Sequence, residues 1–194
     1  MTYWDPVPAL RAAVGEPLPL WAGDLVHRDW SLPAPDGWEQ RDWRSVPGPL
    51  YAANTDTCLT GRQCAPDLVM YEDRYGSEFL YRQPRDTAEA HAFICAADCE
   101  PFQGYGGDGD LRWTPELVRD WWRERGRVRE WAAAQGWGAG AESARALGGN
   151  DAGARAYVAH IDGDLEGYLR GYLFRLQEGR AARPGETLPG LGGA

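Results

Sequence analysis

A predicted β-hairpin near the middle of the chain constrains the fold more than any other part of the sequence. Leu68–Tyr71 and Phe79–Tyr81 are apolar or aromatic runs, and the polar segment between them contains Gly76, which can adopt a positive φ. Pairing is expected to end before Pro84, because proline has no N–H to donate to a neighbouring strand. The pattern therefore predicts an antiparallel hairpin over about residues 68–82.

Three long helices are predicted after the hairpin. Asp86 is placed to cap the first, and Glu89, three residues later, completes a capping box. Thr114 is placed to cap the second, and Pro115 occupies its first helical position. Apolar residues at helical spacing extend the second and define the third. The expected ranges are about 86–99, 115–135 and 151–178.

Strands followed by helices, without strict alternation, predict an α+β fold. The expected architecture is a small antiparallel sheet built on the hairpin, covered by the three main helices. Pro49–Thr57 is expected to add a strand beside the hairpin, giving at least three strands. The length of 194 residues suits one domain, predicted over 1–178.

Both ends of the chain are expected to differ from this body. Residues 1–49 are rich in proline and tryptophan and are predicted to be an extended wrap whose indoles fill the core. The tryptophans of this wrap are Trp4, Trp21, Trp30, Trp38 and Trp43. Residues 179–194 are glycine, proline and charge, and are predicted to form a flexible tail.

Glycines elsewhere suggest two further expectations. The residues of Gly104–Gly109 match the G-x-G-x-x-G pattern of dinucleotide-binding loops. However, a helix rather than a strand precedes them, and Asp108 and Asp110 would repel phosphate. Pro101–Leu111 is therefore predicted to be a flexible, solvated loop. A cation held by the two aspartates is the less favoured alternative. In the third helix, glycines recur every four residues, which predicts close packing against another backbone. These glycines are Gly163, Gly167 and Gly171.

The charge balance limits the classes of partner. The net charge is −9 and every cation is an arginine, so a nucleic-acid partner is not expected. A partner protein should be neutral or basic. Met1–Leu20 carries acidic residues and four prolines in place of a signal peptide, and no apolar run has the length of a membrane span. A cytoplasmic protein with no membrane partner is expected, and there cysteines are thiols or ligands rather than disulfides.

The four cysteines and one histidine form the most suggestive group. His91, Cys95 and Cys99 lie at i, i+4 and i+8 on one predicted helix face, and Cys58 and Cys64 flank a loop upstream. These five residues are the candidate zinc ligands, although their spacing matches neither common zinc nor iron–sulfur motifs. The sequence favours packed structural thiols over a metal site, and a metal site over a redox pair. Apart from zinc at these residues, no cofactor is expected.

A local cluster of arginines is the candidate partner surface. The residues assigned to it are Arg119, Arg123, Arg127, Trp113 and Trp122. Arginine and tryptophan are preferred at protein interfaces, but carboxylates interleave with the arginines, so a solvated, salt-bridged helix face is favoured over docking.

No catalytic residues are assigned. The three histidines lie in no nucleophile motif, and His160, among apolar neighbours in a helix, is expected to be a core residue. The leading hypothesis is a non-catalytic, soluble, intracellular interaction protein, such as an inhibitor, an immunity-type protein or an accessory factor. The first alternative is a small metalloprotein or metal-dependent enzyme that uses the Cys/His group. The second is a small-molecule binder or enzyme with an aromatic-lined pocket.

Overall fold

The predicted hairpin forms the centre of an α+β fold. The computed structural model describes residues 3–13, 37–135 and 150–192. Strands β2 (Val69–Tyr71) and β3 (Glu78–Leu80) pair antiparallel, with Val69 opposite Leu80. The turn between them uses Gly76 at a φ of 81°. The hairpin, its register-setting turn and the fold class are therefore as the sequence predicts.

The expected sheet of three or more strands is wrong. β1 (Tyr51–Ala52) pairs with β4 (Tyr105–Gly106), so the described residues form two separate two-stranded antiparallel sheets. β4 lies inside the segment that was expected to be a flexible, solvated loop. This segment lies against β1 because the Ala53 N–H donates to the Gly104 carbonyl over 2.7 Å. At Gly106 a Cβ would lie 2.2 Å from the Tyr51 ring, so only glycine allows this approach.

Two of the three long helices form where they were predicted. α3 (Thr87–Cys99) is capped by the Asp86 side chain, which accepts from the Glu89 N–H over 2.9 Å. α5 (Pro115–Ala134) is capped by Thr114, which accepts from the Leu117 N–H. The shorter helical segments are α1 (Val7–Ala13), α2 (Gly61–Cys64), α4 (Gly109–Arg112) and a 3-10 turn at Trp38–Gln40.

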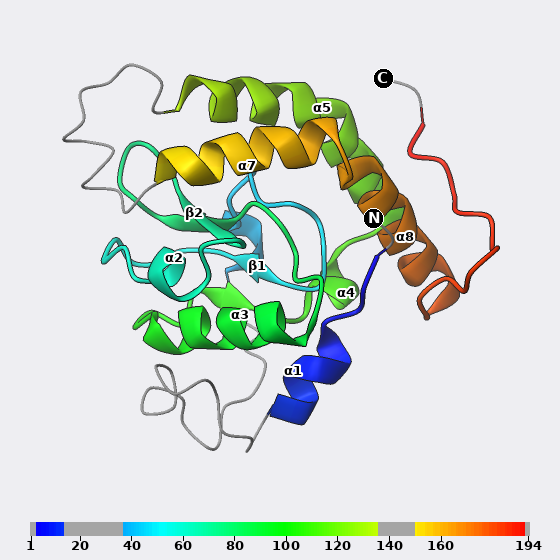
Figure 1. Ribbon diagram of the computed structural model, residues 1–194, viewed down its shortest axis with the longest axis horizontal. Helices are drawn as coiled ribbons and strands as arrows, with labels where there is room; N and C mark the ends of the chain where they lie inside the picture. Colours follow the sequence, from blue (N-terminus) through cyan, green and yellow to red (C-terminus); the bar gives the residue numbers. More distant parts are fainter. Residues whose placement is uncertain (1–2, 14–36, 136–149, 193–194) are drawn as a thin grey trace.

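The third predicted helix is two helices. α7 (Asn150–Asp162) and α8 (Leu165–Glu178) are separated at Gly163, whose N–H donates to the His160 carbonyl in a tightened turn. Glycine is a weak helix former, so the chain can change direction there, and α8 leaves the line of α7 (Figure 1). The close packing predicted for the helix glycines occurs at Gly171, where a Cβ would lie 2.5 Å from Tyr3 Cβ.

The hairpin is buried on both faces. Figure 1 shows it between α5 and α7 on one side and α3 on the other. Met70 and Phe79 belong to the apolar cluster that includes α5, α7 and α8, whereas Val69 and Leu80 belong to the cluster with α1, α2 and α3. Alternate residues of a strand point to opposite faces, so this alternation explains why both sides of the short strands are apolar.

The ends of the chain lie against this body. Trp38 is buried, with its ring 4.8 Å from Tyr51 and 5.2 Å from Trp113, and Trp43 and Trp4 are half-buried. The remaining two tryptophans of the predicted wrap, Trp21 and Trp30, lie outside the described residues. In the tail, Leu191 is buried. The mobility expected for 179–194 stays a prediction.

Among the described ranges, none of the helices has the length and apolar character that crossing a membrane requires.

Candidate thiol centre

Three of the four cysteines converge. Cys64 ends α2, and Cys95 and Cys99 lie one turn apart on the same face of α3. The Cys64 Sγ is 2.7 Å from the Cys95 Sγ and 3.6 Å from the Cys99 Sγ. All three sulfur atoms lie within 4.8 Å of one another. All three are free thiols in this structure, so the cluster offers three soft donor atoms at one point.

α2 is held in place by the hairpin, and this directs Cys64 towards α3. The Gly61 N–H donates to Glu78 Oε1 over 2.7 Å, and a Cβ at Gly61 would lie 2.2 Å from the other oxygen of that carboxylate. The Arg62 N–H donates to the Tyr71 hydroxyl, and the Arg62 guanidinium donates to the Val69 carbonyl over 2.8 Å. These bonds attach a four-residue helix to both strands of the hairpin.

The thiols are buried to different depths. Cys95 is fully buried, Cys64 is 8% exposed and Cys99 is half-buried, so solvent reaches the cluster from Cys99. Burial and the hydrogen bond with Cys64 raise the pKa of the Cys99 thiol to about 11. The hydrogen bond with Cys95, together with burial, raises the pKa of Cys64 well above its ordinary value. Burial therefore disfavours the thiolate form, the nucleophilic form, at Cys64 and Cys99.

Two of the five candidate zinc ligands lie outside the cluster. Cys58 is exposed, in the loop before α2, where its N–H donates to Asp56 Oδ1 over 3.1 Å. His91 is half-buried one turn before Cys95 on α3, but its ring does not join the three sulfur atoms. Sequence spacing shows that residues share a helix face, but it does not show which of them the second element meets.

Both tryptophans assigned to the candidate partner surface are largely buried. Trp113 and Trp122 are both buried in the core between the hairpin and the helices. Of the arginines, Arg123 and Arg127 are exposed and Arg119 is half-buried. The three arginines therefore lie at or near the surface of α5, whereas both indoles are largely buried and only Trp122 lines a groove on this helix.

The exposed arginines already have partners within the chain. Arg123 pairs with Asp120, and the Arg127 guanidinium lies 3.9 Å from the centre of the Trp43 ring. Arg119 donates to the Gly190 carbonyl of the tail over 3.4 Å. Of these three contacts, only Arg123–Asp120 is an ion pair of the kind expected for a salt-bridged face of α5; the other two are with a tryptophan ring and a backbone carbonyl.

A groove lies beside this face, and two of the five candidate partner residues, Trp122 and Arg123, belong to its lining. It has a volume of about 550 Å³ and lies between α5 and the junction of α7 with α8. Its lining includes Arg125, Gly126 and Arg129 on α5 and Gly163 at the junction. A glycine within a helix was the available signal, and at Gly126 a Cβ would meet nothing within 4 Å.

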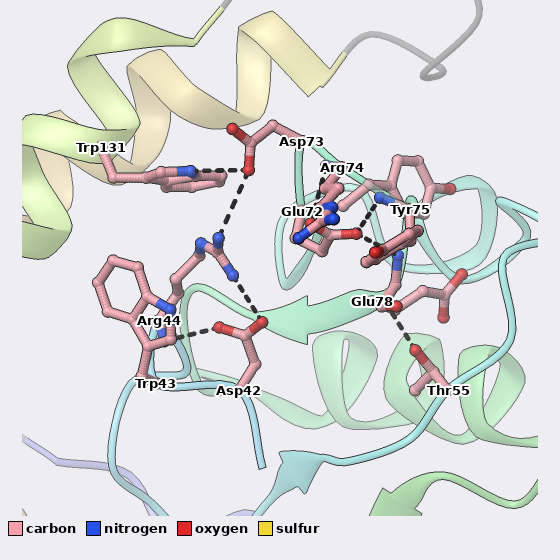
Figure 2. Close-up of polar contacts among 12 residues, drawn as sticks. Asp42, Trp43, Arg44, Thr55, Glu72, Asp73, Arg74, Tyr75, Glu78 and Trp131 are labelled. Carbon is pink, nitrogen blue, oxygen red and sulfur yellow. Dashed lines mark hydrogen bonds and ion pairs between the residues drawn. The ribbon is translucent and has the colours of Figure 1, made fainter. Parts of the chain in front are cut away.

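A second, smaller cleft lies between β1 and the hairpin turn. It has a volume of about 210 Å³, and its lining includes the carboxylates of Asp42, Glu72 and Glu78. Figure 2 shows that these groups already serve the fold: Asp42 binds the Arg44 guanidinium, and Glu72 accepts from the Arg74 N–H over 2.8 Å. Glu78 accepts from the backbone of α2. The carboxylates of this cleft are therefore committed to internal partners.

Comparisons with protein-family models, with curated proteins and with solved structures found no match to this chain. Its function is therefore inferred from its own residues.

Proposed function

We propose that the protein binds a thiophilic metal ion through the Sγ atoms of Cys64, Cys95 and Cys99. The observation that supports this is the convergence of three sulfur atoms, within 4.8 Å, from two helices far apart in the sequence. Thiolate is the ligand that selects soft ions such as Zn²⁺ and Cu⁺. Of the roles open to the Cys/His group, the geometry supports metal binding best.

The three sulfur atoms are close enough together to share one ion. A Zn–S bond of about 2.3 Å in tetrahedral geometry places neighbouring sulfur atoms about 3.8 Å apart. The separations from the Cys64 Sγ to the Cys95 and Cys99 Sγ atoms, 2.7 Å and 3.6 Å, are both shorter than that value, and the Cys95–Cys99 separation is at most 4.8 Å. Binding one ion would therefore require the Cys64 and Cys95 sulfur atoms to move apart by about 1 Å.

Packing alone is a weaker explanation of the cluster. A thiol is only a weak hydrogen-bond donor and acceptor, so gathering three of them adds little stability beyond that of small apolar side chains. A bound cation, in contrast, interacts with all three sulfur atoms at once. Packed structural thiols, which the sequence favours, remain the alternative that experiment must exclude.

The test is titration of the reduced protein with Cd²⁺ and Zn²⁺, followed by ultraviolet thiolate-to-metal charge transfer and elemental analysis. One equivalent of ion is expected, and the loaded protein should melt at a higher temperature until a chelator removes the ion. Cys99→Ser should lose most of the affinity, whereas Cys58→Ser, the matched exposed control, should retain it. Binding of neither ion, or equal binding by both variants, would overturn the proposal.

The interaction role expected from the sequence is the second candidate. The observation that favours it is the groove beside α5, in which Gly126 leaves open space over the helix. A Cβ at Gly126 meets nothing within 4 Å, so the side chain of a Gly126→Trp variant begins in open space and should block a partner that docks there, with circular dichroism to show that the variant is folded. Co-purification from the native host at low and moderate salt tests this, with Gly126→Ala as the control. Equal capture by both variants would exclude the groove.

A further inference from the structure

We infer that the thiol centre takes a trivalent thiophilic ion, supplied as arsenous acid, As(OH)₃. This inference rests on the proposed function and specifies its ligand. The features that carry it are the number of sulfur donors, their burial and the charges around them.

The number of donors is three. Within the described residues, no histidine, carboxylate or further cysteine joins Cys64, Cys95 and Cys99 in the cluster. A structural zinc site uses four protein ligands, so with this set a zinc ion would need a water molecule as its fourth ligand. Trivalent arsenic forms three bonds to sulfur in a pyramid, and its lone pair occupies the remaining direction. Three thiolates therefore complete its coordination.

The charge balance also favours a trivalent ion. Three thiolates with a divalent ion leave a net charge of −1, whereas three thiolates with a trivalent ion are neutral. Cys95 is fully buried and Cys64 nearly so, and burying a net charge is costly unless an opposite charge compensates it. Outside the cluster itself, the carboxylates of Glu78 and Asp98 raise the pKa of Cys64 and Cys99 respectively, so both carboxylates oppose negative charge on the sulfur atoms. A neutral complex avoids repulsion from both.

The binding reaction balances without a redox partner. In each exchange, one thiol S–H bond and one As–O bond are broken, and one As–S bond and one O–H bond are formed. Three such exchanges convert As(OH)₃ and three thiols into the tris-thiolate complex and three molecules of water. Arsenic stays trivalent, no electron is transferred, and neutral reactants give neutral products.

The route of entry follows from the exposure of the thiols. Cys99, the half-buried member, is the first thiol that a ligand from solvent reaches. Cys64 lies 3.6 Å from it and Cys95 lies behind, 2.7 Å from Cys64. Arsenous acid is small and uncharged at neutral pH. It can therefore reach the inner thiols without losing a hydration shell, as a metal cation would have to do.

The test compares arsenite with Cd²⁺ on the reduced full-length protein. After desalting, intact-mass measurement should show one arsenic atom and the loss of three protein hydrogens. Cys99→Ser, which keeps only two thiols of the cluster, should bind arsenite at least tenfold more weakly, and Cys58→Ser should bind like the unmodified chain. Circular dichroism of each variant reports whether it is folded.

The outcomes separate this inference from the proposed function. Retention of Cd²⁺ without retention of arsenite would overturn the inference and leave the proposed function standing. Arsenite binding that is unchanged in Cys99→Ser would also overturn it. Retention of neither ion would overturn both. Tight arsenite binding that needs all three thiols would support both.

Discussion

Replacing Arg44 with methionine should destabilise the protein strongly, because this side chain joins three parts of the fold. Its guanidinium binds Asp42 over 2.8 Å and lies 4.5 Å from the centre of the Trp131 ring on α5 (Figure 2). It also contacts Asp73 in the hairpin turn, to which the Trp131 indole N–H donates over 3.0 Å. The N-terminal segment, the hairpin and α5 therefore meet at one cation.

The magnitude follows from the burial of the ion pair. The side chains of Arg44 and Asp42 are 12% and 17% exposed, and removing one partner of a buried pair costs about 3–5 kcal/mol. Asp42 keeps a bond from the Arg44 backbone N–H, so the lower end applies, and methionine replaces most of the apolar stem. We expect the free energy of unfolding to fall by about 3 kcal/mol. For a chain of this size the melting temperature should fall by about 10 °C.

The pH dependence of this loss distinguishes an uncompensated charge from lost packing. Burial raises the pKa of Asp42, and the Arg44 guanidinium opposes that rise. Without Arg44 the folded-state pKa rises further above the unfolded value of about 3.9, so the folded state binds the extra proton. Acidification then restores stability, and the deficit of Arg44→Met should be smaller at pH 5 than at pH 7.

Urea unfolding at both pH values, in a double-mutant cycle with Asp42→Asn, measures the effect. The cost of Arg44→Met should fall by at least about 1 kcal/mol when Asp42 is already neutral. Arg44→Lys keeps the charge but loses the planar contacts with the rings of Trp43 and Trp131, so as the control it should lose stability by an amount that is the same at both pH values. An Arg44→Met deficit that is the same at both pH values and in both backgrounds would refute the assignment to an uncompensated Asp42.

Two further predictions concern the helices. Burial lowers the pKa of His160, although its ring binds Asp164 over 2.9 Å, so the folded state favours the neutral ring. Stability should therefore fall as the pH drops below the unfolded value of about 6.5, and His160→Gln should flatten that part of the pH–stability curve; an unchanged curve would contradict this. Gly171→Ala should lower the free energy of unfolding by about 1–3 kcal/mol, because the new Cβ would lie 2.5 Å from Tyr3 Cβ. Gly126→Ala, in open space on a helix, should raise it by about 1 kcal/mol. Urea unfolding that shows the same sign for both variants would refute this reading.

Features that depend on neighbouring residues in the sequence were predictable. The hairpin of β2 and β3 and the caps of α3 and α5 form where the residues predict them. Turn and cap signals act within a few residues, because the hydrogen bonds they make are local. The α+β class follows from the order of these elements. The sequence could also show that Cys95 and Cys99 share a face, since helix geometry alone decides that.

The tertiary structure decided which distant segments meet. β1 pairs with β4 rather than with the hairpin, and the third predicted helix ends at Gly163. Cys64 joins the α3 thiols and Cys58 does not, because hydrogen bonds from the Gly61 and Arg62 N–H groups to Glu78 and Tyr71 fix the position of α2. Such contacts depend on how whole elements pack, and no local spacing encodes that. The sequence alone determined the set of candidate donors, and packing selected the three sulfur atoms that form the candidate site.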